Sequence, residues 1–277
     1  MESVDKQQSV WHRLRTAVDE SQFRLYYQPQ VEQRTGRIVG AEALLRWQDP
    51  ASGLLAPEDF LPALERTGLI VPVGAWAFQQ AAEDCQRWRH LGLPRLKIAM
   101  NVSAEQLVPD EVDAYVQRVR TTREVCDVQI EIDSRLLLSA ADGFSRVVHT
   151  LRAAGAAIVV QGYGTEDAIP HRLWSMPVDA LKIHRSFVSR MLGDVDVDDR
   201  ISGLLLLARA FRLVSIAEGV ETSSQYDRLG ELCCEWSQGF LHSPPVPADR
   251  FEWLLRSDFY SRSSNAVSGT GRLAYDA

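Results

Sequence analysis

The chain has 277 residues, of which 45% are hydrophobic and 24% are charged, as is ordinary for a globular protein. Its 30 basic and 37 acidic residues give a formal net charge of −7, which argues against a general nucleic-acid binder, because such proteins neutralise phosphates with basic surface. The best apolar run, residues 201–214, contains Arg209 and Arg212, and the polar N-terminus does not resemble a signal peptide. We therefore expect a cytoplasmic protein without a membrane segment.

The four cysteines are Cys85, Cys126, Cys233 and Cys234, and none of them belongs to a CxxC pair or stands at zinc-finger spacing from a histidine. The adjacent Cys233 and Cys234 could form a redox or metal feature. Small buried residues on the last helical segment are the favoured interpretation, because free cysteine is among the most buried residue types. The set is typical of a reducing compartment.

Along the chain, residues 1–21 form the first predicted element, an amphipathic lead-in helix with Val10, Trp11, Leu14 and Val18 on one face. Strand-like and helix-like segments then alternate. The predicted strands are residues 23–31, 38–47, 96–100, 128–132, 157–160, 180–183, 213–217 and 236–240. The predicted helices are residues 57–67, 74–91, 104–116, 140–154, 171–175, 200–211, 223–232 and 248–255.

This alternation predicts a single α/β domain over residues 22–256, folded as a TIM-like (β/α)8 barrel. The first two strands are joined by the turn at Thr35-Gly36 and can pair as a hairpin, which makes the first strand antiparallel to the second. After Ser257 the composition shifts to serine, glycine, asparagine and arginine, which predicts a disordered tail over residues 257–277.

Polar residues follow or end the apolar runs of the predicted strands. In a barrel of this kind, catalytic and binding residues lie at the carboxyl ends of the strands. One such residue could be a core ion pair, but a series that converges on one rim favours a site. Glutamate and asparagine oxygens suit Mg²⁺ or Mn²⁺. The series is Glu42, Asn101, Glu131, Gln161, Lys182, Glu218 and Gln238.

Six blocks in order resemble the signature of the EAL domain family, which comprises bacterial cyclic di-GMP phosphodiesterases and their inactive relatives. A lone Glu-Ala-Leu would carry little weight, but the six blocks extend the resemblance over residues 14–255, nearly the whole chain. The blocks are Tyr27-Gln28-Pro29, Glu42-Ala43-Leu44-Leu45-Arg46-Trp47, Asn101-Val102-Ser103, Asp179-Ala180-Leu181-Lys182-Ile183, Ala217-Glu218-Gly219-Val220-Glu221-Thr222 and Gln238-Gly239-Phe240.

The resemblance implies a role for each of these positions. Glu42, Asn101 and Glu131 would bind a first metal ion, and Lys182 and Glu218 would belong to the catalytic apparatus, with Lys182 steering the attacking water. Arg46 would hold a phosphate of the dinucleotide, for which its planar guanidinium is suited. The residues implied in ligand binding are Gln28, Leu44, Arg46, Glu221 and Gln238.

The chain departs from the family pattern at the end of the fifth barrel strand. There the family has two adjacent aspartates, which clasp the metal ions, and this chain has Gln161 and Gly162. The loop that follows is altered at residues 166–169, Ser134 replaces a glutamate that braces this loop, and His184 replaces an aspartate. A two-metal hydrolysis depends on both cations, so these changes predict a catalytically inactive, degenerate EAL domain.

Three functions follow, in order of preference. The first is a non-hydrolytic receptor or regulator that binds cyclic di-GMP and signals to a protein partner. The second is a nucleotide-independent protein-interaction module, and the third is a weak phosphodiesterase. No cofactor is required by the first, although Mg²⁺ or Mn²⁺ could bind at one residual site formed by Glu42, Asn101 and Glu131. Members of the family often pair, so a homodimer is a further expectation.

Overall fold

In the computed structural model, which describes residues 2–139, 142–163 and 176–265, ten strands form one sheet. The sheet has the order β10-β1-β9-β8-β7-β6-β5-β4-β2-β3, and β1 also pairs with β2. The strands are β1 (Phe23–Glu32), β2 (Arg37–Asp49), β3 (Gly53–Leu55), β4 (Lys97–Asn101), β5 (Asp127–Asp133), β6 (Ala157–Tyr163), β7 (Ala180–Ile183), β8 (Val214–Glu218), β9 (Trp236–Gln238) and β10 (Val246–Pro247).

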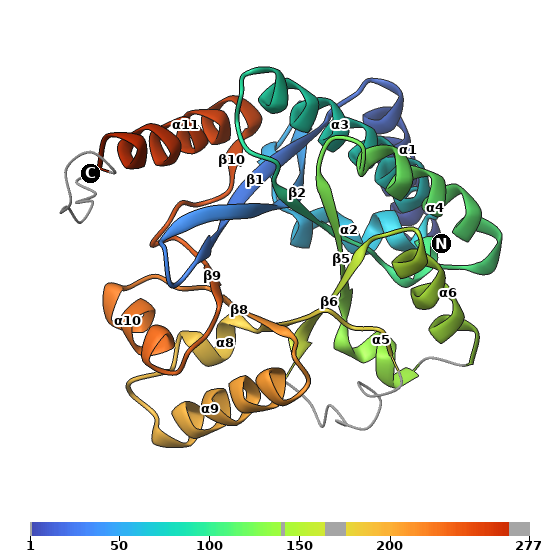
Figure 1. Ribbon diagram of the computed structural model, residues 1–277. Helices are drawn as coiled ribbons and strands as arrows, with labels where there is room; N and C mark the ends of the chain where they lie inside the picture. Colours follow the sequence, from blue (N-terminus) through green and yellow to red (C-terminus); the bar gives the residue numbers. More distant parts are fainter. Residues whose placement is uncertain (1, 140–141, 164–175, 266–277) are drawn as a thin grey trace.

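The double pairing of β1 closes the sheet into a barrel of eight strands, to which β3 and β10 are short additions. Strand β1 runs antiparallel to both neighbours, β2 and β9, whereas β2, β4, β5, β6, β7, β8 and β9 are parallel to one another. Figure 1 shows this ring of strands with helices around it. The predicted barrel with an antiparallel first strand is confirmed.

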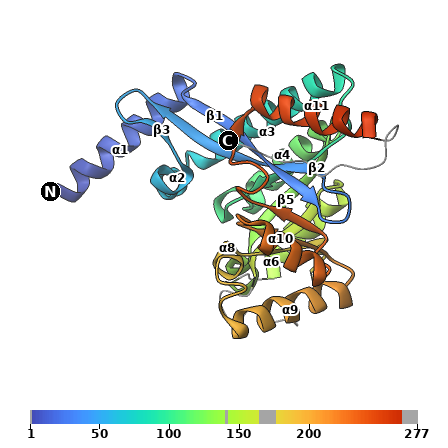
Figure 2. The same ribbon diagram turned by 90° about the vertical axis from the view of Figure 1, so that its left-hand side faces the viewer.

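Helices cover the outside of the barrel. The described helices are α1 (Glu2–Asp19), α2 (Pro57–Arg66), α3 (Ile70–His90), η1 (Ala104–Gln106), α4 (Pro109–Thr122), α5 (Ser134–Ser139), α6 (Asp142–Ala153), α8 (Arg185–Val188), α9 (Val195–Ala210), α10 (Ser223–Glu231) and α11 (Ala248–Asn265). In Figure 2, α1 projects from the body beside α2. Its buried residues Leu14 and Ala17 belong to a small core with Phe60 and Leu64 of α2.

Alternation along the strands separates an outer apolar layer from an inner polar one. On β5, Val128, Ile130 and Ile132 belong to the main hydrophobic cluster with the surrounding helices. The intervening Gln129 and Glu131 are equally buried but face the barrel interior, because successive side chains of a strand point to opposite faces. Most polar residues of the series are next to an apolar residue of the outer layer, so their own side chains face the barrel interior.

Several helix boundaries differ from expectation, most clearly in two segments. The helix predicted over residues 104–116 is divided into η1 and α4, which begins with Pro109 at its first position. Helix α11 continues to Asn265, past the position at which a disordered tail was predicted, and no glycine or proline interrupts residues 248–265. The helix predicted over residues 171–175 lies outside the described residues.

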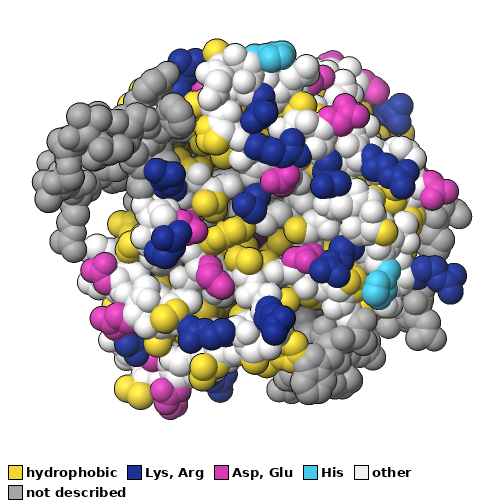
Figure 3. Space-filling model, in the orientation of Figure 1, with side chains coloured by type: hydrophobic (Ala, Val, Ile, Leu, Met, Phe, Trp, Pro, Cys, Tyr) yellow, Lys and Arg dark blue, Asp and Glu magenta, His cyan; other side chains and the backbone are white. Residues whose placement is uncertain are grey.

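The exterior of the barrel is mixed in charge. On the face shown in Figure 3, basic and acidic side chains are interspersed with apolar ones rather than gathered into one large field. Among the described helices, none combines the length and apolar character needed to cross a bilayer.

Candidate functional site

Six of the predicted site residues lie at the carboxyl ends of neighbouring barrel strands and are joined by hydrogen bonds. The centre of this hydrogen-bonded network is Lys182 of β7. Its Nζ donates to Oε2 of Glu42 at 2.6 Å and to Oε2 of Glu131 at 2.8 Å. The three side chains are buried, with 1%, 6% and 0% of their surfaces exposed, respectively. One ammonium thus joins β2, β5 and β7 across the barrel interior.

The charges of Lys182, Glu42 and Glu131, together with their burial, determine which of these three groups is ionised. Burial lowers the pKa of Lys182, but the two carboxylates outweigh this effect and hold that pKa above its usual range. Burial also raises the pKa of Glu131, to about 8, with a further contribution from the charge of Glu42. Burial opposes ionisation of Glu42, but Lys182, Asn101 and Gln238 reverse it and lower the pKa of that carboxyl. Glu42 is therefore the carboxylate that remains ionised.

Side-chain amides complete the environment of Glu42. Asn101 of β4 donates from Nδ2 to Oε1 of Glu42 at 2.5 Å, and Gln238 of β9 donates from Nε2 to Oε2 at 2.6 Å. The same Nε2 of Gln238 lies 2.8 Å from Oε1 of Gln28, and Gln161 of β6 donates to Oδ1 of Asn101 at 3.0 Å. Six of the seven residues of the sequence series, all except Glu218, are therefore brought together as one network.

Gln30 is a member of this network that the sequence analysis missed. It is fully buried on β1, and its Nε2 donates to Oε1 of Gln238 at 3.3 Å. The signal was present in the sequence, because Gln28 and Gln30 are alternate residues on a strand whose intervening positions are apolar. The backbone carbonyl of Ser243, which accepts from Nε2 of Gln28, could not be found in this way because it follows from the loop conformation.

The end of β6 has a backbone that suits glycine. Gly162 has a φ of +72°, in the left-handed region that residues with a Cβ adopt at a cost, and the pairing with β7 is irregular between Val160 and Tyr163. Ser134 donates from Oγ to the carbonyl of Gly162 at 3.3 Å. The strand end at which the family pattern has two aspartates is thus irregular in its pairing, and the loop residues 166–169 that follow lie outside the described residues.

Arg46 lies four residues after Glu42 on β2. Alternate residues of a strand share a face, so both side chains are on the inner face. Its guanidinium lies 5.5 Å from the ring centre of Tyr26 on β1, and its Nη1 donates to the backbone carbonyl of Leu45 at 2.9 Å. Partial burial lowers the pKa of Arg46, although an arginine remains charged. Leu44, between Glu42 and Arg46 on this face, is half-buried.

Two other predicted residues, Glu218 and Glu221, make no side-chain hydrogen bond to the described residues of the network. Glu218 ends β8 beside Gln238 in the strand register and contributes to raising the pKa of Glu131, so its charge acts on the triad. Glu221 is exposed. The backbone between Glu218 and Glu221 lies close to the end of β9, since a Cβ on Gly239 would lie 2.1 Å from the carbonyl oxygen of Val220. Glycine at this position permits the contact that holds Gln238 at the rim.

His184 and the adjacent residues Cys233 and Cys234 have surroundings that indicate structural roles rather than a place in the site. His184 is the residue before α8, and its Nδ1 accepts a hydrogen bond from the backbone N–H of Ser186 at 3.2 Å, as a capping side chain does. Cys233 is exposed and Cys234 is buried, and both are free thiols. Cys234 lies against the carbonyls of Ser215 and Trp236. Both were expected to be small buried residues on the last helical segment. Cys234 is buried but, like Cys233, follows the end of α10, and Cys233 is exposed in a turn with a φ of +58°.

The donor atoms present do not fit a pair of divalent cations. Both oxygens of Glu42 and the Oδ1 of Asn101 accept hydrogen bonds from the protein, and β6 contributes no carboxylate. Oε1 of Glu131 is a buried oxygen of this set without a partner. Within the described residues, no group of three or more histidine, cysteine, aspartate or glutamate side chains is arranged to hold a metal ion.

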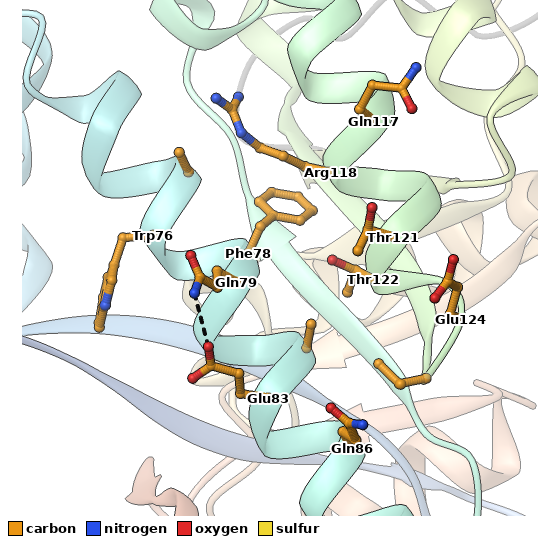
Figure 4. Close-up of a pocket in the computed structure, with 13 residues that line it drawn as sticks. Trp76, Phe78, Gln79, Glu83, Gln86, Gln117, Arg118, Thr121, Thr122 and Glu124 are labelled. Atoms are coloured by element: carbon orange, nitrogen blue, oxygen red, sulfur yellow. Dashed lines mark hydrogen bonds between the residues drawn. The ribbon is translucent and has the colours of Figure 1, made fainter.

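A separate groove lies on the outside of the barrel between α3 and α4. It has a volume of about 730 Å³ and is lined by Trp76, Phe78 and Glu83 of α3 and by Arg118 and Thr121 of α4, among others. Figure 4 shows the ring of Phe78 directed from α3 toward α4. None of the predicted site residues lines this groove, so it is distinct from the strand-end network.

The family model for the EAL domain matches residues 11–245, most of the chain. The chain belongs to the EAL domain family. Its relatives include a bifunctional diguanylate cyclase/cyclic di-GMP phosphodiesterase, MucR, from Pseudomonas aeruginosa, which is 34% identical over 90% of this chain. Another is the cyclic di-GMP phosphodiesterase PdeR of Escherichia coli, which is 31% identical over 88% of this chain.

Solved EAL structures have the same fold. The MucR phosphodiesterase in complex with cyclic di-GMP superposes with a TM-score of 0.82, at 34% identity, and the match covers 88% of this chain and 99% of that one. The EAL enzyme Bd1971 in its form bound to cAMP and cyclic di-GMP gives a TM-score of 0.83 at 28% identity, with 92% of this chain and 70% of that one covered. The chain spans only 36% of the MucR sequence and 37% of the PdeR sequence.

Proposed function

We propose that this EAL domain binds cyclic di-GMP without hydrolysing it and acts as a receptor. The observation that carries the proposal is the end of β6, where Gln161 and Gly162 bring no carboxylate to the network formed by Glu42, Asn101 and Glu131. Hydrolysis of a phosphodiester by two metals needs ligands that hold both cations against the attacking and leaving oxygens. Without these ligands, the remaining pocket can bind an anion but has no means of activating water.

The binding side of the proposal rests on Arg46. Its charged guanidinium is half-buried on the inner face of β2, over the ring of Tyr26, and is not paired with a carboxylate in an ion pair of the described residues. An arginine in this state can form two parallel hydrogen bonds to a phosphate. The solved structure of the related MucR phosphodiesterase is a complex with cyclic di-GMP, which supports the choice of ligand.

A receptor also needs a partner that responds to the bound state. We propose that the nucleotide-bound domain, residues 22–256, is read by another protein or by another part of a longer polypeptide, as the short span relative to the curated relatives permits. The segment before it contains α1 (Glu2–Asp19), whose exposed Trp11 and Val10 are available for such a contact. Pairing of two copies of the chain belongs to the same proposal.

Replacement of Arg46 tests the binding site. We expect R46A to weaken cyclic di-GMP binding about 10- to 100-fold, because a hydrogen bond to a charged group contributes about 1.5–3 kcal/mol. The control is R37A at the opposite end of the same strand, which should bind as the wild type does. Isothermal titration calorimetry gives both affinities, and equal binding by R46A and the wild type would remove Arg46 from the site.

A second candidate is a protein-interaction module that binds no nucleotide. The observation in its favour is the charge of the rim, where the ionised Glu42 already balances the ammonium of Lys182 and the carboxylate of Glu218 adds a further negative charge. Such a rim repels phosphates, and the repulsion decreases as ionic strength rises. Absence of calorimetric binding at both low and high salt would favour this candidate over the receptor.

A further inference from the structure

The hydrogen bonds around Glu42 determine which way its neighbouring amides point. An ionised carboxylate can only accept, so Asn101 must turn its NH₂ group toward Oε1 of Glu42. The carbonyl oxygen of Asn101 then points away from Glu42 and accepts from Nε2 of Gln161 at 3.0 Å. A directed chain of hydrogen bonds therefore runs from Gln161 through Asn101 to Glu42, and only a donor at position 161 completes it.

This chain occupies the oxygens that would otherwise bind a cation. Oε1 of Glu42 and Oδ1 of Asn101 are engaged by it, and Oε2 of Glu42 accepts from both Lys182 and Gln238. A metal ion at this place would have to displace at least two N–H donors and would lie close to the buried ammonium of Lys182. Like charges at such a separation repel strongly where the surroundings are poor in water.

We propose that Gln161 is a positioning residue whose side chain holds Asn101 as a donor to Glu42, so that the pocket excludes divalent cations instead of retaining one of them. This deepens the proposed function, on which it rests for the role of the pocket, and it replaces the single residual metal site expected from the sequence. The ammonium of Lys182 supplies the positive charge that balances Glu42. The amides of Gln161 and Asn101 complete the hydrogen bonds, so the network needs no metal ion.

The test is a titration of the full chain with Mn²⁺ alone, without nucleotide, followed by electron paramagnetic resonance of the free ion at constant ionic strength. The wild type should show no binding up to about 1 mM. In Q161E the side chain keeps its shape but cannot donate to Asn101, which frees an amide oxygen and adds a carboxylate. We expect Q161E to bind one Mn²⁺ per chain at least about tenfold more tightly than the wild type.

The matched control is Q117E, which adds the same charge on the outer helix α4, where Gln117 is exposed, and should behave as the wild type. Binding of one Mn²⁺ by the wild type that is lost in E131Q would overturn the inference, and this result does not depend on whether Q161E folds. Equal Mn²⁺ affinity of a folded Q161E and the wild type would also overturn it. Neither result bears on nucleotide binding or hydrolysis, so the receptor proposal is tested separately.

Discussion

At the scale of single residues, the two positions at the end of β6 matter more than a loss of two ligands would suggest. Gln161 has become a hydrogen-bond donor within the network, and Gly162 has a backbone conformation in which a side chain is strained. Restoring carboxylates here therefore changes both the hydrogen bonding and the local backbone. Among the described residues, a Cβ on Gly162 would meet nothing nearer than Oγ of Ser134, at 3.6 Å, so strain rather than a clash with them is the obstacle.

The double variant Q161D/G162D tests this description. We expect it to acquire hydrolysis of cyclic di-GMP to the linear dinucleotide in the presence of Mn²⁺, because both carboxylates of a two-metal site are restored. We also expect a loss of about 1–2 kcal/mol in the free energy of unfolding, since position 162 has a positive φ. The products are measured by chromatography and the stability by urea denaturation.

The variant G162A provides the matched control for the double variant. It introduces the strain at the same position without a carboxylate, so it should lose stability and gain no activity. A double variant that folds and remains inactive would locate a second defect elsewhere, such as the altered loop at residues 166–169. Equal hydrolysis by the wild type and the double variant would contradict the interpretation of the strand end.

His242 provides a pH-dependent contribution to stability. Burial lowers its pKa to about 4, and its Nε2 lies 2.8 Å from Oγ of Ser237. Between about pH 4 and pH 6.5, the unfolded chain holds a proton on this histidine that the folded chain does not. Stability from this group is therefore complete above pH 6.5 and is lost as the pH falls through 4.

The measurement is the free energy of unfolding from pH 7 to pH 4 for the wild type and for H242Q. The wild type should lose more stability than the variant over this range, by at most about 1.4 kcal/mol for each pH unit. Other acidic groups titrate in both proteins, so only the difference between the two curves reports on His242. Parallel curves would show that this histidine is not kept neutral by the fold.

The sequence predicted much of the site at this scale because strand ends converge in a barrel. It correctly brought together Glu42, Asn101, Glu131, Lys182 and Gln238. It could not predict that Gln161 donates to Asn101, because either end of an amide can face a neighbour until the charge next to it is placed. It also gave no means of placing Arg46 over Tyr26, which depends on the register of β1 and β2.

At the scale of the elements, the hydrophobic patterns predicted the strands better than the helices. The buried strands β4 and β7 begin and end within one residue of expectation, because polar residues limit short apolar runs on both sides. The ends of the helices on the exterior are less clearly marked in the sequence. Helix α11 continues past Ser257 because serine and asparagine only weakly oppose a helix, whereas the composition of that segment had suggested a tail.

Helix α11 is fixed to the barrel by one aromatic cluster. Phe251 is fully buried, with its ring centre 5.7 Å from that of Tyr27 on β1 and 5.2 Å from that of Trp88 on α3. We expect F251A to lower the free energy of unfolding by about 3–5 kcal/mol, because it leaves a cavity among rings that cannot close it. Since Tyr27 is adjacent to Gln28, the cluster also supports the inner face of β1.

The control for this prediction is W253A, on the same helix, where the side chain of Trp253 is 50% exposed. Its replacement should change the free energy of unfolding by no more than about 0.5 kcal/mol, as for other surface positions. Thermal or urea denaturation measures both variants. Equal effects of F251A and W253A would indicate that α11 is not held through its buried face.

At the scale of the whole molecule, the chain has the barrel architecture of the EAL domain, with Gln161 and Gly162 where the family pattern has two aspartates. The closed sheet depends on the apolar outer layer, which tolerates replacements at the polar rim, so the fold is compatible with Gln161 and Gly162 at the end of β6.

The most direct test of this account is to measure binding and turnover in the same sample. Cyclic di-GMP is titrated into the wild-type chain by calorimetry with Mg²⁺ or Mn²⁺ present, and the contents of the cell are then analysed by chromatography after prolonged incubation. The account predicts saturable binding with the cyclic dinucleotide recovered intact. Appearance of the linear dinucleotide in amounts exceeding the protein, and its loss in an E42A variant, would contradict the account.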